Sequence, residues 1–449
     1  MVSLGAQPGA AVPHSSISLS YFFTIPNLDI SSAADEISAL ILRFVITPDL
    51  AIRKILANAK PLPSCRMDIR KTDGLVLASH VCCPDGLPRF DNSAVDGYAV
   101  KAADVRGASK ARPVSLRLIG EVHAGSSNQP VVKKGLAVRI ATGARIPPGA
   151  DAVVMQEYCE RKGTVLRVCD TEPRWGNIRR RGEEIRRGQI ALRKGQTLNS
   201  GSIAWLATMG IKTALVHRPP RVGLLRSGNE VVEWGVSPQP HQVRDAHGVS
   251  LPLALKKIYS ASSGMELEVK MPSIVRDDMK QTVRAFSMLL KDCDLVVTTG
   301  GVSVGERDLF HAAAKTYGLK TIFCKVSQKP GKPMVFARRG PKLWFGLPGN
   351  PVASLVCFYL YVKPCLLRMI GHPHVEPEWF EAKAAEAFRP NARRTDFLRG
   401  CLKNGRVTFA EKQGSHCLGS FADANVLVKI PPSSRPGKAG DPILCIHLP

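Results

Sequence analysis

The sequence predicts a multidomain protein of the α/β plus β class, with an open, mostly parallel α/β sheet domain, a β-rich insertion and a small C-terminal β barrel. Its 449 residues correspond to about three or four domains at ~100–200 residues each. Hydrophobic residues make up 44% and charged residues 22%, which excludes a wholly disordered chain. Patterning divides the chain into residues 46–90 plus 190–216, 91–189, 217–372 and 373–449.

The first segments predict helices. Residues 1–45 are an extension assigned to no domain, and the first 42 residues contain no Lys or Arg, unlike a secretory signal or a transit peptide. Apolar residues at helical spacing from Ser32 to Leu56 predict one or two helices before a Lys-Pro-Leu-Pro break. A further helix is predicted from Ser200 to Ile211. We therefore expect a helical linking domain over residues 46–90 and 190–216.

Short strand patterns mark the insertion of residues 91–189 and the C-terminal domain of residues 373–449. In both segments, β-branched runs alternate with Gly and Pro turns, which is typical of small β modules. The predicted strands lie at residues 113–119, 150–155 and 165–168 in the insertion, and at 406–409, 424–430 and 443–447 in the C-terminal domain.

The sheet domain of residues 217–372 is predicted from three apolar runs that each lead into a Gly-rich turn. Residues 222–225 precede Ser-Gly-Asn-Glu, residues 294–299 precede Gly-Gly-Val-Ser-Val-Gly, and residues 343–347 precede Pro-Gly-Asn-Pro. Runs that are apolar on both faces and separated by helical patterns indicate a parallel sheet. Ligands of such sheets bind beyond the carboxyl ends of the strands, so the three turns are expected to share one crevice.

The charge pattern predicts an anionic ligand. The formal net charge is +25, which attracts nucleic acid, lipid headgroups or small oxyanions without choosing among them. The turn with Gly300, Gly301 and Gly305 offers backbone N–H groups to an oxyanion, although a lone glycine loop more often only closes a connection. Lys329 and Lys332 stand on a stiff Lys-Pro-Gly-Lys-Pro loop, for which a solvated turn is the alternative.

Acidic residues follow the same turns. Glu230, Asp277 and Asp308 are near the anion-binding segments, and carboxylates there would repel the ligand unless a divalent cation such as Mg²⁺ lies between them. Helix N-capping is an equally good explanation of Asp308. The sequence thus leaves metal binding and capping both open.

Polar side chains gather in three further segments. Asp91 begins an Asp-Asn-Ser-Ala-Val-Asp-Gly segment, which is also what an Asx-rich turn requires, and Thr142 begins an equally ambiguous Thr-Gly-Ala turn. Arg394 and Ser415 offer donors suited to a tetrahedral oxyanion, with a solvated strand edge as the alternative.

Two classes of protein are disfavoured. No apolar run reaches the ~18 residues of a membrane span, so an integral membrane protein is not expected. The twelve cysteines include no C-x-x-C pair, which argues against a zinc ribbon and indicates a reducing compartment, so we expect a cytoplasmic location.

From about Leu56 to its end, the sequence resembles the MoeA-type molybdopterin molybdenumtransferases, the family of the gephyrin E domain. Six phrases in the family's order carry this resemblance. They are Asp-Asn-Ser-Ala-Val-Asp-Gly-Tyr-Ala at 91–99, Thr-Gly-Ala at 142–144 with Gly-Ala-Asp-Ala-Val-Val at 149–154, Arg-Arg-Arg-Gly-Glu-Glu at 179–184, Gly-Gly-Val-Ser-Val-Gly at 300–305, Lys-Pro-Gly-Lys-Pro at 329–333 and Gly-Leu-Pro-Gly-Asn-Pro-Val at 346–352.

The resemblance implies four domains and a homodimer whose cleft takes residues from both chains. It implies insertion of molybdate into adenylylated molybdopterin with the help of Mg²⁺ and release of AMP, and a pterin-adenylylating enzyme as pathway partner. By position, it assigns catalytic roles to Asp91, Thr142, Glu230, Asp308, Lys329 and Lys332. It assigns metal binding to Asp277, Asp308 and Glu230, and pterin or molybdate binding to Gly300, Gly301, Ser303, Gly305, Pro348, Pro351, Arg394 and Ser415.

The sequence departs from the family pattern in two places. Asn229 stands where the family usually has Asp, which removes one carboxylate beside Glu230, and residues 244–248 lack the family's Asp-Ser-Asn-Arg phrase. A gephyrin-like scaffold with weakened catalysis is therefore an alternative. Nucleic-acid binding is less favoured, because aromatic residues total only 6% and no nucleic-acid motif is present.

Overall fold

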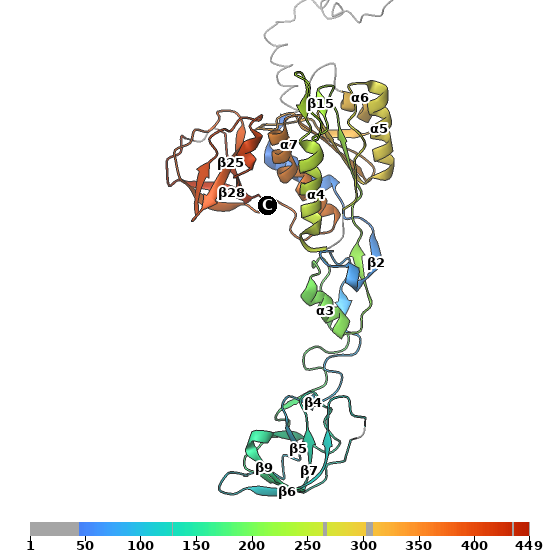
Figure 1. The fold of residues 1–449 in the computed structure, drawn as a ribbon, viewed down its shortest axis with the longest axis vertical. Coiled ribbons are helices and arrows are strands. Elements are labelled where there is room, and N and C mark those ends of the chain that lie inside the picture. Colours follow the sequence, from blue (N-terminus) through green and yellow to red (C-terminus); the bar gives the residue numbers. More distant parts are fainter. Residues whose placement is uncertain (1–44, 128, 264–266, 302–308, 433–434, 449) are drawn as a thin grey trace, which may run out of the picture.

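The computed structural model describes residues 45–448 except residues 128, 264–266, 302–308 and 433–434. The described chain is elongated (Figure 1). The β-rich insertion lies at one end of the long axis, the α/β sheet domain lies at the other end, and the C-terminal domain sits beside the sheet domain. A linking region with α3 (Ser200–Thr208) connects the insertion to the sheet domain.

The sheet domain is built on six strands in the order β17-β14-β18-β23-β22-β19. Its central strands β14, β18 and β23 are parallel and in register, so that Arg226, Thr299 and Leu347 stand side by side where the strands end. Strand β22 runs antiparallel to both its neighbours. This confirms the open, mostly parallel sheet. The bounds are β14 Val222–Arg226, β17 Val269–Lys270, β18 Leu295–Thr299, β19 Lys320–Phe323, β22 Val335–Arg339 and β23 Lys342–Leu347.

Consecutive residues of the central strands enter two different cores, which explains their uninterrupted apolar sequence. Val297 and Phe345 belong to one core, whereas the adjacent Val296 and Trp344 pack against Phe286 in the other. Helices α5 (Met279–Asp292) and α6 (Leu309–Thr316) cover the second core. The first core is covered by α4 (His247–Ser263), α7 (Pro351–Cys357), the π-helix η4 (Phe358–Val362) and α8 (Lys363–Met369).

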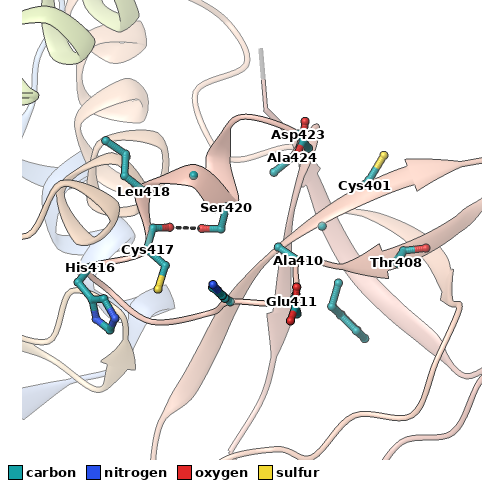
Figure 2. A pocket seen from close by; sticks show the side chains of 14 residues that line it. Cys401, Thr408, Ala410, Glu411, His416, Cys417, Leu418, Ser420, Asp423 and Ala424 are labelled. Carbon is teal, nitrogen blue, oxygen red and sulfur yellow. Dashed lines mark hydrogen bonds between the residues drawn. The ribbon is translucent and has the colours of Figure 1, made fainter.

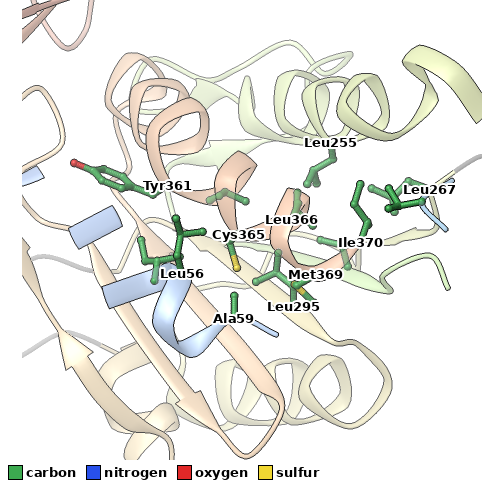
Figure 3. Packing of buried hydrophobic residues seen from close by; sticks show 14 of the residues in the cluster. Leu56, Ala59, Leu255, Leu267, Leu295, Tyr361, Cys365, Leu366, Met369 and Ile370 are labelled. Atoms are coloured by element: carbon green, nitrogen blue, oxygen red, sulfur yellow. The ribbon is translucent and has the colours of Figure 1, made fainter. Parts of the chain in front are cut away.

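Helix α2 (Pro48–Asn58) belongs to the same large core. Figure 3 shows Leu56 and Ala59 beside Cys365 and Met369 of α8. Strand β1 (Val45–Ile46) adds a parallel pair with β20 (Lys325–Val326) of the sheet domain. Among the described residues, the run Pro351–Met369 alone has the length and hydropathy of a membrane span, and 78% of it is buried inside the protein. Its apolarity is therefore explained by the core that it fills.

The linking region differs from the helical domain that we expected. It holds one α-helix, α3 (Ser200–Thr208), whose N-cap Asn199 and residue Ser202 form a reciprocal capping box. The remainder consists of two antiparallel strand pairs and a 3₁₀ turn, while α2 packs on the sheet domain instead. The elements are β2 Ser64–Asp68 with β13 Thr213–His217, β3 Val81–Cys82 with β12 Ile190–Leu192, and η2 Ile69–Lys71.

The insertion is a six-stranded sheet with separate apolar clusters on its two faces, in the order β8-β5-β7-β6-β10-β9. A small pair, β4 with β11, joins the segment of Asp91 to the arginine-rich segment near residue 180. The bounds are β4 Asn92–Ser93, β5 Gly97–Val100, β6 Val114–Val122, β7 Leu136–Ile140, β8 Ala152–Met155, η3 Gln156–Tyr158, β9 Cys159–Lys162, β10 Val165–Val168 and β11 Ile178–Arg179.

The C-terminal domain is a closed five-stranded barrel, as expected, because β25 pairs with both β26 and β27. The long strand β25 (Thr395–Lys403) was not predicted as such. Strand β21 (Gln328–Lys329) of the sheet domain pairs with it and attaches the barrel to the Lys-Pro-Gly-Lys-Pro segment of residues 329–333, called the lysine loop below. The other bounds are β24 Phe380–Ala384, β26 Arg406–Phe409, η5 Leu418–Phe421, β27 Val426–Ile430 and β28 Pro442–His447.

Candidate active site

The three Gly-rich turns of the sheet domain meet at the carboxyl edge of the strands. Gly300 has φ +82°, and a Cβ atom there would lie 2.9 Å from the carbonyl oxygen of Ser227. A Cβ atom at Gly349 would lie 3.6 Å from the Cα of Gly300. Glycine is thus required at position 300 both by its left-handed backbone and by the close approach of the first turn. The described parts of the three turns therefore lie next to one another, and the single crevice that they were expected to share remains a prediction.

Pro348 and Pro351 frame the third turn. The Ser354 hydroxyl donates to the carbonyl oxygen of Pro348, and Pro351 occupies the first turn of α7, where its missing N–H costs nothing. Between them, Asn350 donates from Nδ2 to the Ser415 hydroxyl of the C-terminal domain at 3.3 Å. This hydrogen bond places Ser415, which was predicted to contact molybdate, beside the edge of the sheet.

The carboxylates of Glu230 and Asp277 flank the first turn. Asn229 accepts from the backbone N–H of Asp277 at 3.1 Å, and its carbonyl oxygen accepts from Arg276 at 2.8 Å. Glu230 folds back over Gly228, where a Cβ would lie 2.8 Å from its Oε2. Asn229 therefore fixes the loop that carries Asp277.

Three of the predicted site residues, Ser303, Gly305 and Asp308, lie outside the described residues. Gly301 is the last described residue of its turn, with φ +59°. Within the described part of the chain, no group of three or more His, Cys, Asp or Glu side chains is arranged to hold a metal ion. The predicted ligand set of Asp277, Asp308 and Glu230 includes one of the residues that are not described.

A buried polar network holds the lysine loop in place. Gln328 is fully buried, donates from Nε2 to the carbonyl oxygen of Pro330 at 2.9 Å, and accepts from the Tyr361 hydroxyl. Tyr361 lies in the π-helical segment η4, a distortion that is frequent at functional sites. The side chains of Lys329 and Lys332 are exposed to solvent. The loop is therefore fixed while its two ammonium groups face solvent.

The barrel supplies further charges beside Lys329. In the β21–β25 pair, Lys329 stands opposite Asp396, which follows Arg394 by two residues. Burial raises the pKa of Asp396, and the nearby Lys329 and Arg394 act in the opposite direction. Sequence reasoning missed Asp396, because the segment that became strand β25 was not predicted as a strand.

Arg399 holds the loop that presents Ser415. The guanidinium is fully buried and donates to the carbonyl oxygens of Lys412 and Gly414 and to the Ser420 hydroxyl. Burial lowers its pKa to about 10, so the group keeps its charge at neutral pH. His416 and Cys417 of the same loop line a cleft of about 620 Å³ (Figure 2).

Replacing Arg399 by methionine is expected to loosen this loop. The substitution leaves two carbonyl oxygens without donors, at about 1–3 kcal/mol for each unsatisfied buried group. We expect amide hydrogen exchange in residues 412–420 to accelerate by at least about tenfold, the equivalent of 1.4 kcal/mol. The matched control is R406M, which changes an exposed arginine of the same barrel. Equal exchange in the two variants would remove Arg399 from this role.

The predicted site residues of the insertion form a second group, in a domain that lies at the opposite end of the long axis from the sheet domain (Figure 1). The backbone N–H of Thr142 donates to Asp96 Oδ1 at 2.8 Å, and that of Arg181 donates to Asp91 Oδ1 at 2.7 Å. Sequence reasoning chose Asp91 and missed Asp96 as the partner of Thr142. Within one chain, these residues are not brought to the lysine loop.

A buried charge pair lies under the first turn and was also missed. Arg226, at the end of β14, donates to Asp245 at 2.7 Å, and both side chains are almost completely buried. His247, at the start of α4, is buried next to them, and its Nε2 has no hydrogen-bond partner among the residues that the structure describes. Burial lowers the pKa of His247 to about 4, with the Arg226 charge acting in the same direction and Asp245 against it.

This histidine predicts an acid-sensitive stability. Between the ordinary pKa of 6.5 and the folded value of about 4, the unfolded chain binds more protons, so stability falls as the pH falls through this window. The loss reaches up to about 3 kcal/mol at the acid end. We expect the midpoint of thermal unfolding to drop less between pH 7 and pH 5 in H247N than in the unchanged protein. An identical drop in both proteins would contradict the assignment.

The family assignment follows from three sequence models that match the chain in order. They are the MoeA N-terminal region (domains I and II) over residues 46–210, a probable molybdopterin binding domain over residues 223–368, and the MoeA C-terminal region (domain IV) over residues 381–448. The chain belongs to the MoeA family.

Individual relatives agree with this assignment of the MoeA chain. A molybdopterin molybdenumtransferase of Staphylococcus epidermidis is 32% identical over 395 residues, which cover 87% of this chain and 93% of the relative. One of Haemophilus influenzae is 33% identical over 408 residues, covering 89% and 98%. A crystal structure of a molybdopterin biosynthesis MoeA protein from Pyrococcus horikoshii matches with a TM-score of 0.79 at 29% identity, over 90% of this chain and 99% of that chain.

The resemblance carried by the six sequence phrases is therefore confirmed. The MoeA chain is an enzyme of molybdenum cofactor biosynthesis, of the molybdenumtransferase type. All twelve of its cysteines are free thiols.

Proposed function

We propose that this MoeA chain inserts molybdate into adenylylated molybdopterin and releases AMP. The observation that carries the proposal is the meeting of four anion-binding segments beside one sheet edge. Gly300 touches the Ser227 turn, Asn350 binds Ser415, and Lys329 pairs with strand β25, which begins directly after Arg394. Substrate and co-substrate are both anions, and such a set of backbone amides and cations can hold them side by side.

We assign different roles to the residues at and beside the sheet edge according to their chemistry. Lys329 and Lys332 stabilise negative charge that develops on the departing AMP when its bond to the pterin phosphate breaks. Arg394 and Ser415 hold the molybdate oxyanion, with Gln328 and Asn350 fixing the loops that bring these groups together. Asp91 or Asp96 of the insertion relays a proton or orients water at the bond being broken.

Glu230 and Asp277 suit a magnesium ion, because Mg²⁺ prefers carboxylate oxygens as ligands. Both carboxylates border the Ser-Gly-Asn-Glu turn at the sheet edge, where we place the anionic substrate. When bound, Mg²⁺ supplies positive charge that neutralises the phosphate bridge of the substrate. The predicted third ligand, Asp308, belongs to the same proposal.

We further propose that the working unit is a homodimer in which the insertion of one chain completes the site of the other. The insertion, which carries Asp91 and Thr142, lies at the opposite end of the molecule from the sheet domain, so a second copy is needed to bring these residues to the lysine loop (Figure 1). Two inactive variants, D91A and K329A, test this idea when refolded together. Random pairing gives hybrid dimers with one intact site, and about a quarter of full activity should return. No recovery would exclude shared sites.

The decisive test of activity uses the purified full chain with adenylylated molybdopterin, molybdate and Mg²⁺. AMP release measured by chromatography should depend on molybdate, and the product should activate an apo-molybdoenzyme. A scaffold with lost catalysis would bind the pterin and release no AMP. A nucleic-acid-binding protein would also release no AMP. The substrate itself must be supplied by an enzyme that adenylylates molybdopterin. We place this work in the reducing cytoplasm, which suits twelve free thiols.

A further inference from the structure

Asp396 of the C-terminal barrel is a carboxyl group that has no role in the proposed function. In the β21–β25 pair, Gln328 and Thr395 stand opposite each other, and both are buried. Side chains alternate along a strand, so the next pair, Lys329 and Asp396, projects to the other face. Asp396 therefore lies on the same face as Lys329, a residue of the proposed active site.

Hydrogen bonds hold the segment around Asp396 against the sheet domain. The backbone N–H of Thr395 donates to the carbonyl oxygen of Ser327 at 3.1 Å. The Ser327 hydroxyl donates to the carbonyl oxygen of Arg393 at 3.1 Å. These two contacts lie on either side of Arg394, which directly precedes β25. Asp396 and the arginine that we assign to molybdate thus belong to one fixed segment.

The surroundings of the Asp396 carboxyl favour its protonated form. The residue is half-buried, and its Oδ1 atom is buried without a hydrogen-bond partner among the described residues. Burial raises the pKa of Asp396, and the charges of Lys329 and Arg394 only partly oppose this effect. On its other side, Asp396 pairs with Ile430 of β27, which carries no charge. A molybdate dianion bound at Arg394 adds negative charge nearby and raises this pKa further.

Molybdate insertion requires a proton donor beside the molybdate. When the two thiols of the pterin bind molybdenum, two S–H bonds break, two S–Mo bonds form, and one oxo group of molybdate leaves as water. The two protons of this water come from the thiols, so atoms and charge balance, and the oxidation state of molybdenum does not change. An oxo group leaves readily only after it is protonated, so a carboxylic acid next to it accelerates the step.

We propose that Asp396 is the general acid of molybdate insertion. It takes up a proton when molybdate binds and donates this proton to the oxo group that leaves. One pterin thiol then returns a proton to Asp396, and the other thiol supplies the second proton of the water. The inference rests on the proposed function for the reaction, whereas the uptake of the proton requires only that molybdate binds.

Calorimetry with molybdate alone tests the uptake of the proton. Titrations of the full chain in buffers of different ionisation enthalpy, between about pH 5.5 and pH 7.5, give the number of protons taken up for each bound molybdate. We expect up to about one proton in the unchanged protein and a clearly smaller number in D396N, which should still bind molybdate. E381Q is the matched control, because Glu381 is an exposed carboxylate on β24 of the same barrel. It should keep the full uptake.

Turnover gives the second readout. D396N should lower kcat for molybdate-dependent AMP release by about 10²–10⁴-fold, the usual range for a general acid, while KM for molybdate changes little. In the unchanged protein, kcat should fall as the pH rises, because the acid form of Asp396 disappears. This decline should be absent in D396N. D396E, which keeps a carboxylic acid, should recover part of the rate.

The outcomes separate this inference from the proposed function. Equal proton uptake in D396N and in the unchanged protein would overturn the role of Asp396, and so would a loss of molybdate binding in D396N. AMP release at full rate by D396N would also overturn it and leave the proposed function standing. Conversely, proton uptake that depends on Asp396, in a protein that releases no AMP from adenylylated molybdopterin, supports the proton site and refutes the proposed function.

Discussion

Replacing Lys332 by alanine is expected to lower kcat for AMP release by about 10²–10³-fold, the usual effect of removing one preorganised electrostatic group. The side chain of Lys332 is exposed, so no packing is lost with its ammonium group. The backbone carbonyl oxygen of Lys332 accepts from the backbone N–H of Val326 at 3.0 Å, and alanine keeps this contact. The loop should therefore stay in place while the charge disappears. Single-turnover measurements of AMP release at saturating substrate check this result.

The matched control is K320A, which removes an exposed lysine from strand β19 of the same domain. Both variants lower the net charge by one, so a general electrostatic effect would appear in both. Retention of full turnover by K332A would contradict the role of the lysine loop. A shift in KM with unchanged kcat would show that Lys332 binds substrate and transition state equally.

The sheet was predictable because its signal is local. Leu224 and Leu225 enter opposite cores, as do Val296 and Val297, and this two-sided burial produces the apolar runs that indicate parallel strands. The Gly-rich turns follow directly at the strand ends, so their convergence required only the rule of parallel topology.

The barrel strand β25 was missed because its interior carries charge. Arg399 and Asp396 break the alternation of apolar and polar residues that marks a strand, and the partners of Arg399 lie 13 to 21 residues further along the chain. Sequence patterns record where a side chain is apolar, whereas a buried guanidinium is tolerated only because distant carbonyl oxygens accept from it.

The choice between Asp91 and Asp96 shows a further limit. Both lie in one Asx-rich segment, and the contact of Asp96 with Thr142 spans 46 residues. Local spacing cannot rank two carboxylates whose partners, the backbone N–H groups of Thr142 and Arg181, lie 46 and 90 residues away in the sequence. Placement of the insertion at the far end of the chain is likewise a property of how domains are joined, which no local pattern encodes.

Replacing Gly331 by alanine is expected to lower turnover by about 10²-fold through displacement of the lysine loop. Gly331 has φ +93°, and its Cβ would lie 2.5 Å from Cys357 Sγ and 2.7 Å from Gln328 Nε2. All three groups are buried, so the backbone must move outward and carry Lys329 and Lys332 with it. The left-handed conformation adds roughly 1–2 kcal/mol for any side chain.

Two further variants separate displacement from general strain. Gly340 also has a left-handed backbone, at φ +56°, but open space surrounds its Cβ position, so G340A bears the conformational cost without the clash. It should lose stability and keep turnover. In the double variant G331A/C357A the sulfur is removed, and part of the activity should return, because the nearest obstacle to the new methyl group is gone. Equal turnover in G331A and G340A would mean that the position of the lysine loop does not limit the reaction.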